Sequence, residues 1–178
     1  MMTNFGFTEY DYVDDVGTNG KMNEVSAAMG LTNLESMDEF IAVNRRNYQI
    51  YQTHLVGLEG VSLFAFDDAE KCNYQYVVLE IDPQITGVKR DELLAILHAE
   101  NVLARRYFYP GCHQMEPYRS YFPHAGLLLP QTEKLSQRVL CLPSGTAVEE
   151  DDIGLICSII ETALAHPREI AARLKALV

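Results

Sequence analysis

Near its start the chain reads Gly17-Thr18-Asn19-Gly20-Lys21-Met22-Asn23-Glu24 and continues without a break as Val25-Ser26-Ala27-Ala28-Met29-Gly30-Leu31. A polar turn with an amide and a cation therefore leads straight into a helix of small residues, for which Asn19 is a suitable N-cap. A helix start can hold an anion, because its free backbone N–H groups and its dipole point toward it. Asn19 and Lys21 are accordingly candidate anion-binding residues; the alternative is a simple capped helix with an exposed lysine.

The composition is that of a globular chain of 178 residues, long enough to bury one substantial core. Apolar residues make up 48%, which is too many for a disordered protein. The formal net charge of −11 argues against nucleic acid or an anionic membrane as a partner, since both favour a basic face. Apolar runs are short, so we expect no transmembrane helix, and the amino end lacks the pattern of a signal peptide.

The four cysteines, Cys72, Cys112, Cys141 and Cys157, form no C-x-x-C pair. We expect free thiols in a reducing cytoplasm, with Cys141 and Cys157 packed in apolar segments, and no metal site. Two alternatives use Cys112-His113. A zinc site would need a second pair of ligands, and a nucleophile–base pair would need a third, orienting group that the sequence does not reveal.

The order of helical and strand patterns predicts an α/β fold with α+β character, in which helices pack on a small, partly antiparallel sheet. Residues 1–20 read as an extended segment, and residues 21–178 as one domain. We expect helices at 21–34, from a capping box at Ser36 to Leu55, at 89–100, at 131–137, from a capping box at Thr146 to Leu164, and at 168–177. We expect strands at 61–66, 74–81, 102–109 and 139–142.

A second candidate site follows the expected strand at 102–109. Arg105 to His113 places two cations, two phenols and an imidazole at a strand end and in the loop beyond it, where ligand groups often collect. Arginine and tyrosine suit a phosphorylated or hydroxylated substrate, through bidentate and phenolic hydrogen bonds. The alternative is an edge strand whose side chains are simply solvated.

Five segments, in this order and spacing, resemble the DegT/StrS family of sugar aminotransferases, which use pyridoxal phosphate. In that family a G-x-N-x-[RK]-M-x-E turn precedes an A-A-x-G-L helix, as it does at Gly17–Leu31. The other segments are Asn4-Phe5-Gly6-Phe7; Arg45-Arg46 with Tyr51 and Leu55; Arg106-Tyr107-Phe108-Tyr109-Pro110 with His113, Pro117 and Tyr118; and Leu129-Pro130, Thr132-Glu133, Leu135-Ser136 and Leu142-Pro143.

The resemblance implies the small C-terminal domain of a fold-type-I aminotransferase. Members of the family transfer an amino group to a keto sugar carried on a nucleoside diphosphate, and they are dimers with the active site at the subunit interface. By the motif, Asn19 and its neighbour Lys21 would contact the cofactor phosphate from the adjacent subunit. The residues that would face the nucleotide sugar are Arg106, Tyr107, Tyr109 and His113.

The resemblance also implies a Schiff-base lysine in an S-F-x-x-x-K segment, and none of the five lysines has that context. We therefore assign no catalytic residue. We expect a carboxy-terminal portion that is inactive as a transaminase by itself and works as a homodimer or with a complementing N-terminal large domain. The alternative hypothesis is a non-catalytic dimerisation or interaction module derived from the same fold.

Overall fold

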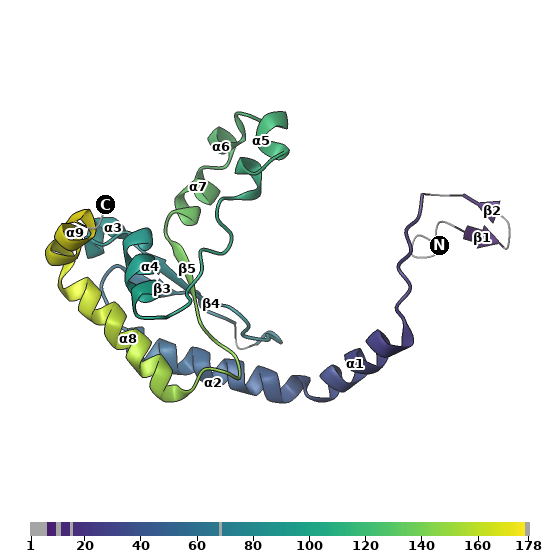
Figure 1. Cartoon of the computed structure of the whole chain (residues 1–178), viewed down its shortest axis with the longest axis horizontal. Coiled ribbons are helices and arrows are strands. Elements are labelled where there is room, and N and C mark those ends of the chain that lie inside the picture. Colours follow the sequence, from purple (N-terminus) through teal and green to yellow (C-terminus); the bar gives the residue numbers. More distant parts are fainter. Residues whose placement is uncertain (1–6, 10–11, 15, 68, 177–178) are drawn as a thin grey trace. The chain divides into compact units, whose positions relative to one another are not determined.

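The computed structural model describes residues 7–9, 12–14, 16–67 and 69–176 of the chain, which divides into two compact units, Met1–Glu39 and Phe40–Val178 (Figure 1). The predicted domain boundary after residue 20 stays a prediction. Of the segment Asn4-Phe5-Gly6-Phe7, the first three residues lie outside the described residues.

The first unit contains two short strands and one helix. Strand β1 (Phe7–Glu9) pairs antiparallel with β2 (Tyr12–Val13), and α1 spans Glu24–Glu35. The prediction of Asn19 as the N-cap is wrong. The helix begins later, because the Asn23 side chain accepts a hydrogen bond from the Ser26 backbone N–H at 2.8 Å. Asn19 and Lys21 therefore lie in the turn before the helix and not at its first residues.

The second unit follows the predicted order of elements, with four short additions and without the strand predicted at 102–109. The predicted elements are α2 (Met37–Leu55), β3 (Val61–Leu63), β4 (Val77–Ile81), α4 (Arg90–Ala99), α7 (Pro130–Ser136), β5 (Val139–Leu142), α8 (Glu150–Ala165) and α9 (Pro167–Ala176). The four additions are α3 (Pro83–Thr86), the 3-10 turn η1 (Cys112–Gln114), α5 (Tyr118–Tyr121) and α6 (Ala125–Leu128). These four are single turns, too short to show a helical period.

A three-stranded sheet, with the order β3-β4-β5, lies at the centre of the second unit. Both pairings are antiparallel, with Leu79 opposite Leu63 on one side and Leu140 on the other. Side chains alternate between the two faces of a strand, and Val77, Leu79 and Ile81 are fully buried on one face of β4. The predicted sheet packed with helices is confirmed, and its described strands are antiparallel throughout.

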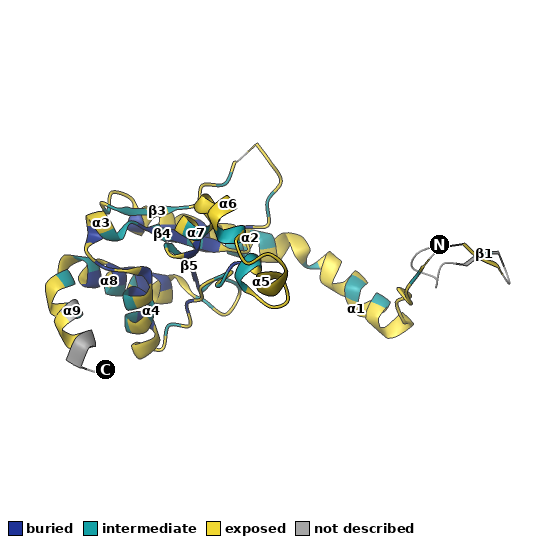
Figure 2. Cartoon of the chain, turned by 90° about the horizontal axis from the view of Figure 1, so that it is seen from above, coloured by how far each residue is buried: buried dark blue, intermediate teal, exposed yellow. Residues whose placement is uncertain are grey.

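Three helices complete the core on the sheet (Figure 2). Buried residues gather on the strands and on the adjoining sides of these helices, while the outer sides are exposed. Helices α4 and α8 lie side by side (Figures 1 and 2). The helical core residues are Tyr48, Tyr51 and Leu55 from α2, Leu93 and Leu97 from α4, and Ile153, Ile156, Cys157, Ile160 and Ala163 from α8.

Two further details of the prediction are wrong. The segment 102–109 is not a strand: only Arg105 pairs with β5, through a single bridge to Cys141. Beyond the bridge the aromatic side chains contact one another, and Tyr107 stacks on Phe108 with ring centroids 5.0 Å apart. Helix α8 is capped at Glu149 rather than at Thr146, and the Glu149 backbone N–H donates to Asp152 at 3.0 Å. No helix among the described residues is long and apolar enough to cross a membrane.

The contact of α8 with the sheet predicts a clear difference between two substitutions on one helix. Ile160 is fully buried and Leu155 is 63% exposed. We expect Ile160→Ala to lower the free energy of unfolding by about 3 kcal/mol, because it leaves a cavity in the core. Leu155→Ala should change it by no more than about 0.5 kcal/mol. Urea denaturation of both variants measures the difference, and equal losses would contradict this packing.

The start of α3 predicts a loss of stability in acid. The Asp82 carboxylate accepts from the Gln84 backbone N–H at 3.0 Å and from Arg138 Nη1 at 2.8 Å. The bond from Gln84, followed by Arg138, holds the pKa of Asp82 below its ordinary value. A lowered folded-state pKa stabilises the fold above the ordinary carboxyl pKa and loses that effect as pH falls toward the folded-state value.

We therefore expect Asp82→Asn, which cannot ionise, to be less stable than the parent chain at neutral pH and to lose less stability on acidification. Urea midpoints between about pH 6 and pH 3 measure both effects. Identical pH profiles for the two proteins would show that Asp82 has the same pKa in the folded and unfolded chain.

Candidate functional site

Arg105 to Tyr109 form the wall of a cavity of about 390 Å³ in the second unit. The wall begins at the backbone bridge between Arg105 and Cys141, with N···O distances of 2.9 and 2.7 Å, so it is tied directly to the sheet. The cavity is also lined by Leu94 and His98 from α4 and by Met115. The structure therefore brings together three of the four predicted substrate-binding residues, Arg106, Tyr107 and Tyr109.

The ring of Tyr109 lies between two arginines. The guanidinium carbon of Arg106 is 4.7 Å from its centroid and that of Arg90 is 5.0 Å away, both within the range of cation–π attraction. Asp91 links the two cations, with Oδ1 2.6 Å from Arg90 Nε and 3.4 Å from Arg106 Nη1. The ring and both cations are therefore held in place without a ligand.

Arg90 is 1% exposed and is the buried part of this cluster. Its Nη1 donates to the Val139 backbone oxygen of β5 at 3.0 Å, whereas its Nη2 is buried with no partner among the described residues. An unpaired buried donor costs free energy. Sequence reasoning missed Arg90 and Asp91, because their part in the site depends on α4 packing against β5.

Tyr107 is held by neighbours of its own. Arg105 Nη1 donates to the Tyr107 hydroxyl at 2.5 Å, and the ring of Tyr76 meets that of Tyr107 edge-on at 5.9 Å. The cavity thus combines two guanidinium groups with aromatic faces and phenolic hydroxyls. This combination suits a ligand with phosphate, hydroxyl and ring groups, because guanidinium pairs with phosphate and aromatic faces stack on rings.

His113 does not line that cavity. It belongs to a small lobe formed by η1, α5, α6 and α7 (Figure 1), where its Nε2 lies 2.5 Å from Glu133 Oε1. Gln114 Nε2 donates to the same oxygen at 2.6 Å. The hydrogen bonds from His113 and then Gln114 hold the pKa of the Glu133 carboxyl below its ordinary value. Glu133 is the orienting group for His113 that the sequence analysis lacked.

The cysteines have mainly structural surroundings. All four are free thiols, as expected, with Cys141 and Cys157 buried and Cys112 exposed. Burial raises the pKa of the Cys157 thiol to about 12 and also raises that of Cys141. Both thiols therefore stay protonated at neutral pH. Within the described ranges there is no cluster of His, Cys, Asp and Glu that could hold a metal ion, and no hydrogen bond joins Cys112 to His113.

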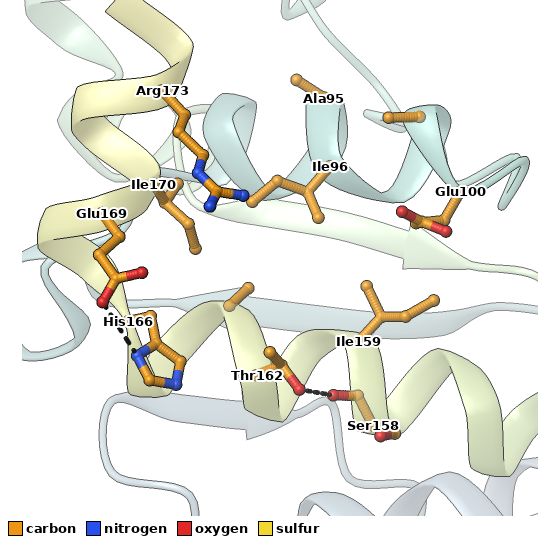
Figure 3. A pocket seen from close by; sticks show the side chains of 12 residues that line it. Ala95, Ile96, Glu100, Ser158, Ile159, Thr162, His166, Glu169, Ile170 and Arg173 are labelled. Carbon is orange, nitrogen blue, oxygen red and sulfur yellow. Dashed lines mark hydrogen bonds and ion pairs between the residues drawn. The ribbon is translucent and has the colours of Figure 1, made fainter.

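A separate cavity of about 590 Å³ lies between α4, α8 and α9 (Figure 3). Ile96, Ile159 and Ile170 lie around it, and its polar groups include a His166–Glu169 pair 3.7 Å apart. None of the predicted site residues line this cavity.

Asn19 and Lys21 belong to the first unit, and both are exposed. The Lys21 backbone N–H lies 3.5 Å from Asn19 Oδ1. This contact uses the carbonyl end of the Asn19 amide, so the end that remains for a ligand is the N–H donor. An amide N–H and an ammonium group are both donors that suit a phosphate.

Comparison with known proteins identifies the family. The family model of the DegT/DnrJ/EryC1/StrS aminotransferases matches residues 1–161, and the chain therefore belongs to that family. Over 159 residues the chain is 31% identical to the dTDP-4-amino-4,6-dideoxy-D-glucose transaminase of Escherichia coli, covering 89% of this chain and 43% of the relative.

Solved structures agree on the fold. DesI, crystallised in the presence of its TDP-sugar product, superposes with a TM-score of 0.87 at 45% identity, over 98% of this chain and 44% of DesI. DesV from S. venezuelae, in complex with a ketimine intermediate, superposes with a TM-score of 0.79 at 22% identity, over 92% of this chain and 42% of its own. The chain thus has the fold of part of a fold-type-I aminotransferase and spans less than half the length of these relatives.

The cluster around Tyr109 predicts a role for Arg90 in stability. We expect Arg90→Ala to lower the free energy of unfolding by about 3 kcal/mol, since it removes a buried cation with its hydrogen bonds and its ring contact. Arg119→Ala is the control, because Arg119 is 66% exposed and pairs with Glu116 on the surface. Denaturation in urea measures both variants, and an unchanged midpoint for Arg90→Ala would contradict the cluster.

Proposed function

We propose that this chain is a working part of a pyridoxal phosphate-dependent nucleotide-sugar aminotransferase and supplies the wall that binds the nucleotide sugar. The observation that carries the proposal is the cavity of about 390 Å³ in which Arg105, Arg106, Tyr107 and Tyr109 meet. Its cations suit a diphosphate, and its rings and hydroxyls suit a base and a sugar. DesI, the structural relative at 45% identity, was crystallised with a TDP-sugar product.

The polar turn before α1 fits the phosphate end of the cofactor. Asn19 and Lys21 are exposed donors on one short turn, and the resemblance of this turn to the family motif supports a contact with the cofactor phosphate. In the proposed enzyme these two residues hold that phosphate from the neighbouring subunit. Pyridoxal phosphate, when bound, supplies the electron sink on which an amino group is carried from donor to keto sugar.

The lysines of the chain do not fit the reactive end of the cofactor. The four whose burial is described, Lys21, Lys71, Lys89 and Lys134, are all exposed, whereas a lysine that binds a carbonyl group is activated by a desolvated pocket or a neighbouring charge. We therefore propose that this chain by itself does not transaminate. The lysine would come from a complementing large domain.

Helix α1 offers a surface for such a partner. It has no buried residue, and Val25, Met29, Leu31 and Leu34 are each more than half exposed. Apolar side chains exposed on several sides of one helix are typical of a helix that is covered by other protein. We propose that this surface packs against a large domain in a cytoplasmic homodimer.

Binding of a thymidine diphosphate sugar to the 178-residue chain tests the proposal. We expect Arg106→Gln to raise the dissociation constant about 10-fold, because it removes a charge-assisted hydrogen bond to the diphosphate. Arg119→Gln removes an exposed cation that does not line this cavity, so it should leave the constant unchanged. Isothermal calorimetry at fixed salt measures all three proteins.

Equal affinities of the parent chain and the Arg106 variant would show that this cavity is not the binding site for the nucleotide sugar. The claim about the cofactor is tested separately by incubating the chain with pyridoxal phosphate and reducing with borohydride. We expect no lysine to be labelled above the level found with denatured chain. Stable labelling of one lysine would show that this chain holds the cofactor covalently on its own.

A further inference from the structure

The structure assigns Glu133 as a positioning residue that fixes the proton of His113 on Nε2, so that Nδ1 is presented to an O–H or N–H group of the substrate. This inference rests on the proposed function, because His113 is a predicted substrate-binding residue, and it adds a second contact at a cavity that is separate from the one lined by Arg106 and Tyr109. In this role Glu133 acts through His113 and does not contact the substrate.

The first observation is the pattern of hydrogen bonds around one carboxylate oxygen. Glu133 Oε1 lies 2.5 Å from His113 Nε2 and 2.6 Å from Gln114 Nε2. Gln114 can donate only from its amide nitrogen, so Oε1 acts as an acceptor for both neighbours. Two convergent donors keep Glu133 ionised, in agreement with the lowered pKa of its carboxyl.

The second observation is the state that this acceptor imposes on the imidazole. An ionised carboxylate has no proton to give, so the proton in the 2.5 Å contact belongs to His113 Nε2. The ring nitrogen that is bonded in this way decides the tautomer, and the other nitrogen is left to act as an acceptor. Nδ1 is therefore the atom at which His113 can accept a hydrogen bond.

The third observation is that Nδ1 has no partner while its ring is almost enclosed. The His113 side chain is 9% exposed, and no described residue donates to Nδ1 or accepts from it. Nδ1 therefore keeps an open acceptor position, which an O–H or N–H donor of a ligand can fill. The imidazole also borders a cavity of about 430 Å³ whose other walls include Phe122, Ala125 and Leu129. In such surroundings a single hydrogen bond counts for more than it would in water.

Gly111 keeps the approach to Nδ1 clear. A Cβ atom at this position would lie 3.0 Å from His113 Nδ1 and 2.8 Å from Cε1, which is too close for the ring to stay where it is. Gly111 is therefore suited to this position by the absence of a side chain. Its replacement by alanine would move the ring while leaving the carboxylate of Glu133 in place.

Nuclear magnetic resonance of the full 178-residue chain, labelled with ¹⁵N, tests the positioning role without any substrate. We expect the ring spectrum of His113 to show a proton on Nε2 that exchanges slowly with water. Glu133→Ala should make this proton exchange at least 10-fold faster, while Glu133→Gln, whose amide oxygen can accept one bond, should restore part of the protection. Glu116→Ala is the matched control, since Glu116 is bonded to Arg119 and Ser120 in the same lobe.

A double-substitution cycle tests the consequence for binding. We expect Glu133→Ala to raise the dissociation constant for a thymidine diphosphate sugar about 10-fold, and to have no further effect once His113→Ala is present. A residue that only stabilises the lobe would instead lower affinity in both backgrounds. Gly111→Ala should weaken binding while retaining a carboxylate at 133, which separates displacement of the ring from loss of charge.

The outcomes distinguish this inference from the proposed function. Unchanged exchange of the Nε2 proton in Glu133→Ala overturns the positioning role, whatever the affinity for nucleotide sugar. If the parent chain binds no nucleotide sugar although the Nε2 proton behaves as expected, the proposed function fails and the effect of Glu133 on His113 remains.

Discussion

Strand β4 is the element on which the second unit depends, because it pairs with β3 on one edge and with β5 on the other. Val77, Leu79 and Ile81 are fully buried on one of its faces, and the core residues of α2, α4 and α8 form one cluster with them. A shift of β4 by one residue would turn this face outward and expose the whole set. The hydrophobic pattern of five residues therefore fixes the register of the sheet and the side on which the helices pack.

Strand β5 connects the sheet to the candidate site. Its Cys141 forms the only backbone bridge to Arg105 among the described residues, and its Val139 carbonyl accepts from Arg90 on α4. The wall from Arg105 to Tyr109 is thus bonded to the sheet at Arg105. At its other end Tyr109 contacts the guanidinium of Arg90, which is itself hydrogen-bonded to β5. A cavity built on such supports keeps its shape before a ligand arrives, which lowers the cost of binding.

The sequence could predict the elements with long periodic patterns, such as α8, and the position of β5 is predicted to the residue. It could not predict that residues 102–109 do not form a strand, because their branched and aromatic residues are typical of one. Those side chains contact one another, and only Arg105 pairs with the sheet. The family motifs predicted a substrate role for Arg106, Tyr107, Tyr109 and His113, whereas periodicity gave no sign of Arg90, Asp91 or Glu133. These three matter through contacts that exist only after distant segments pack together.

Arg90 shows why stability alone does not account for this arrangement. A buried cation with an unpaired Nη2 is more costly than an apolar side chain of similar volume, and replacing buried charges in that way is often neutral or stabilising. The chain instead has a guanidinium against one face of Tyr109 and a second one, from Arg106, within cation–π distance of the same ring. The two cations fix the ring and add positive charge next to the cavity of a chain whose net charge is −11. Local positive charge of this kind favours the approach of an anion to an otherwise acidic protein, which is what the proposed function requires of this cavity.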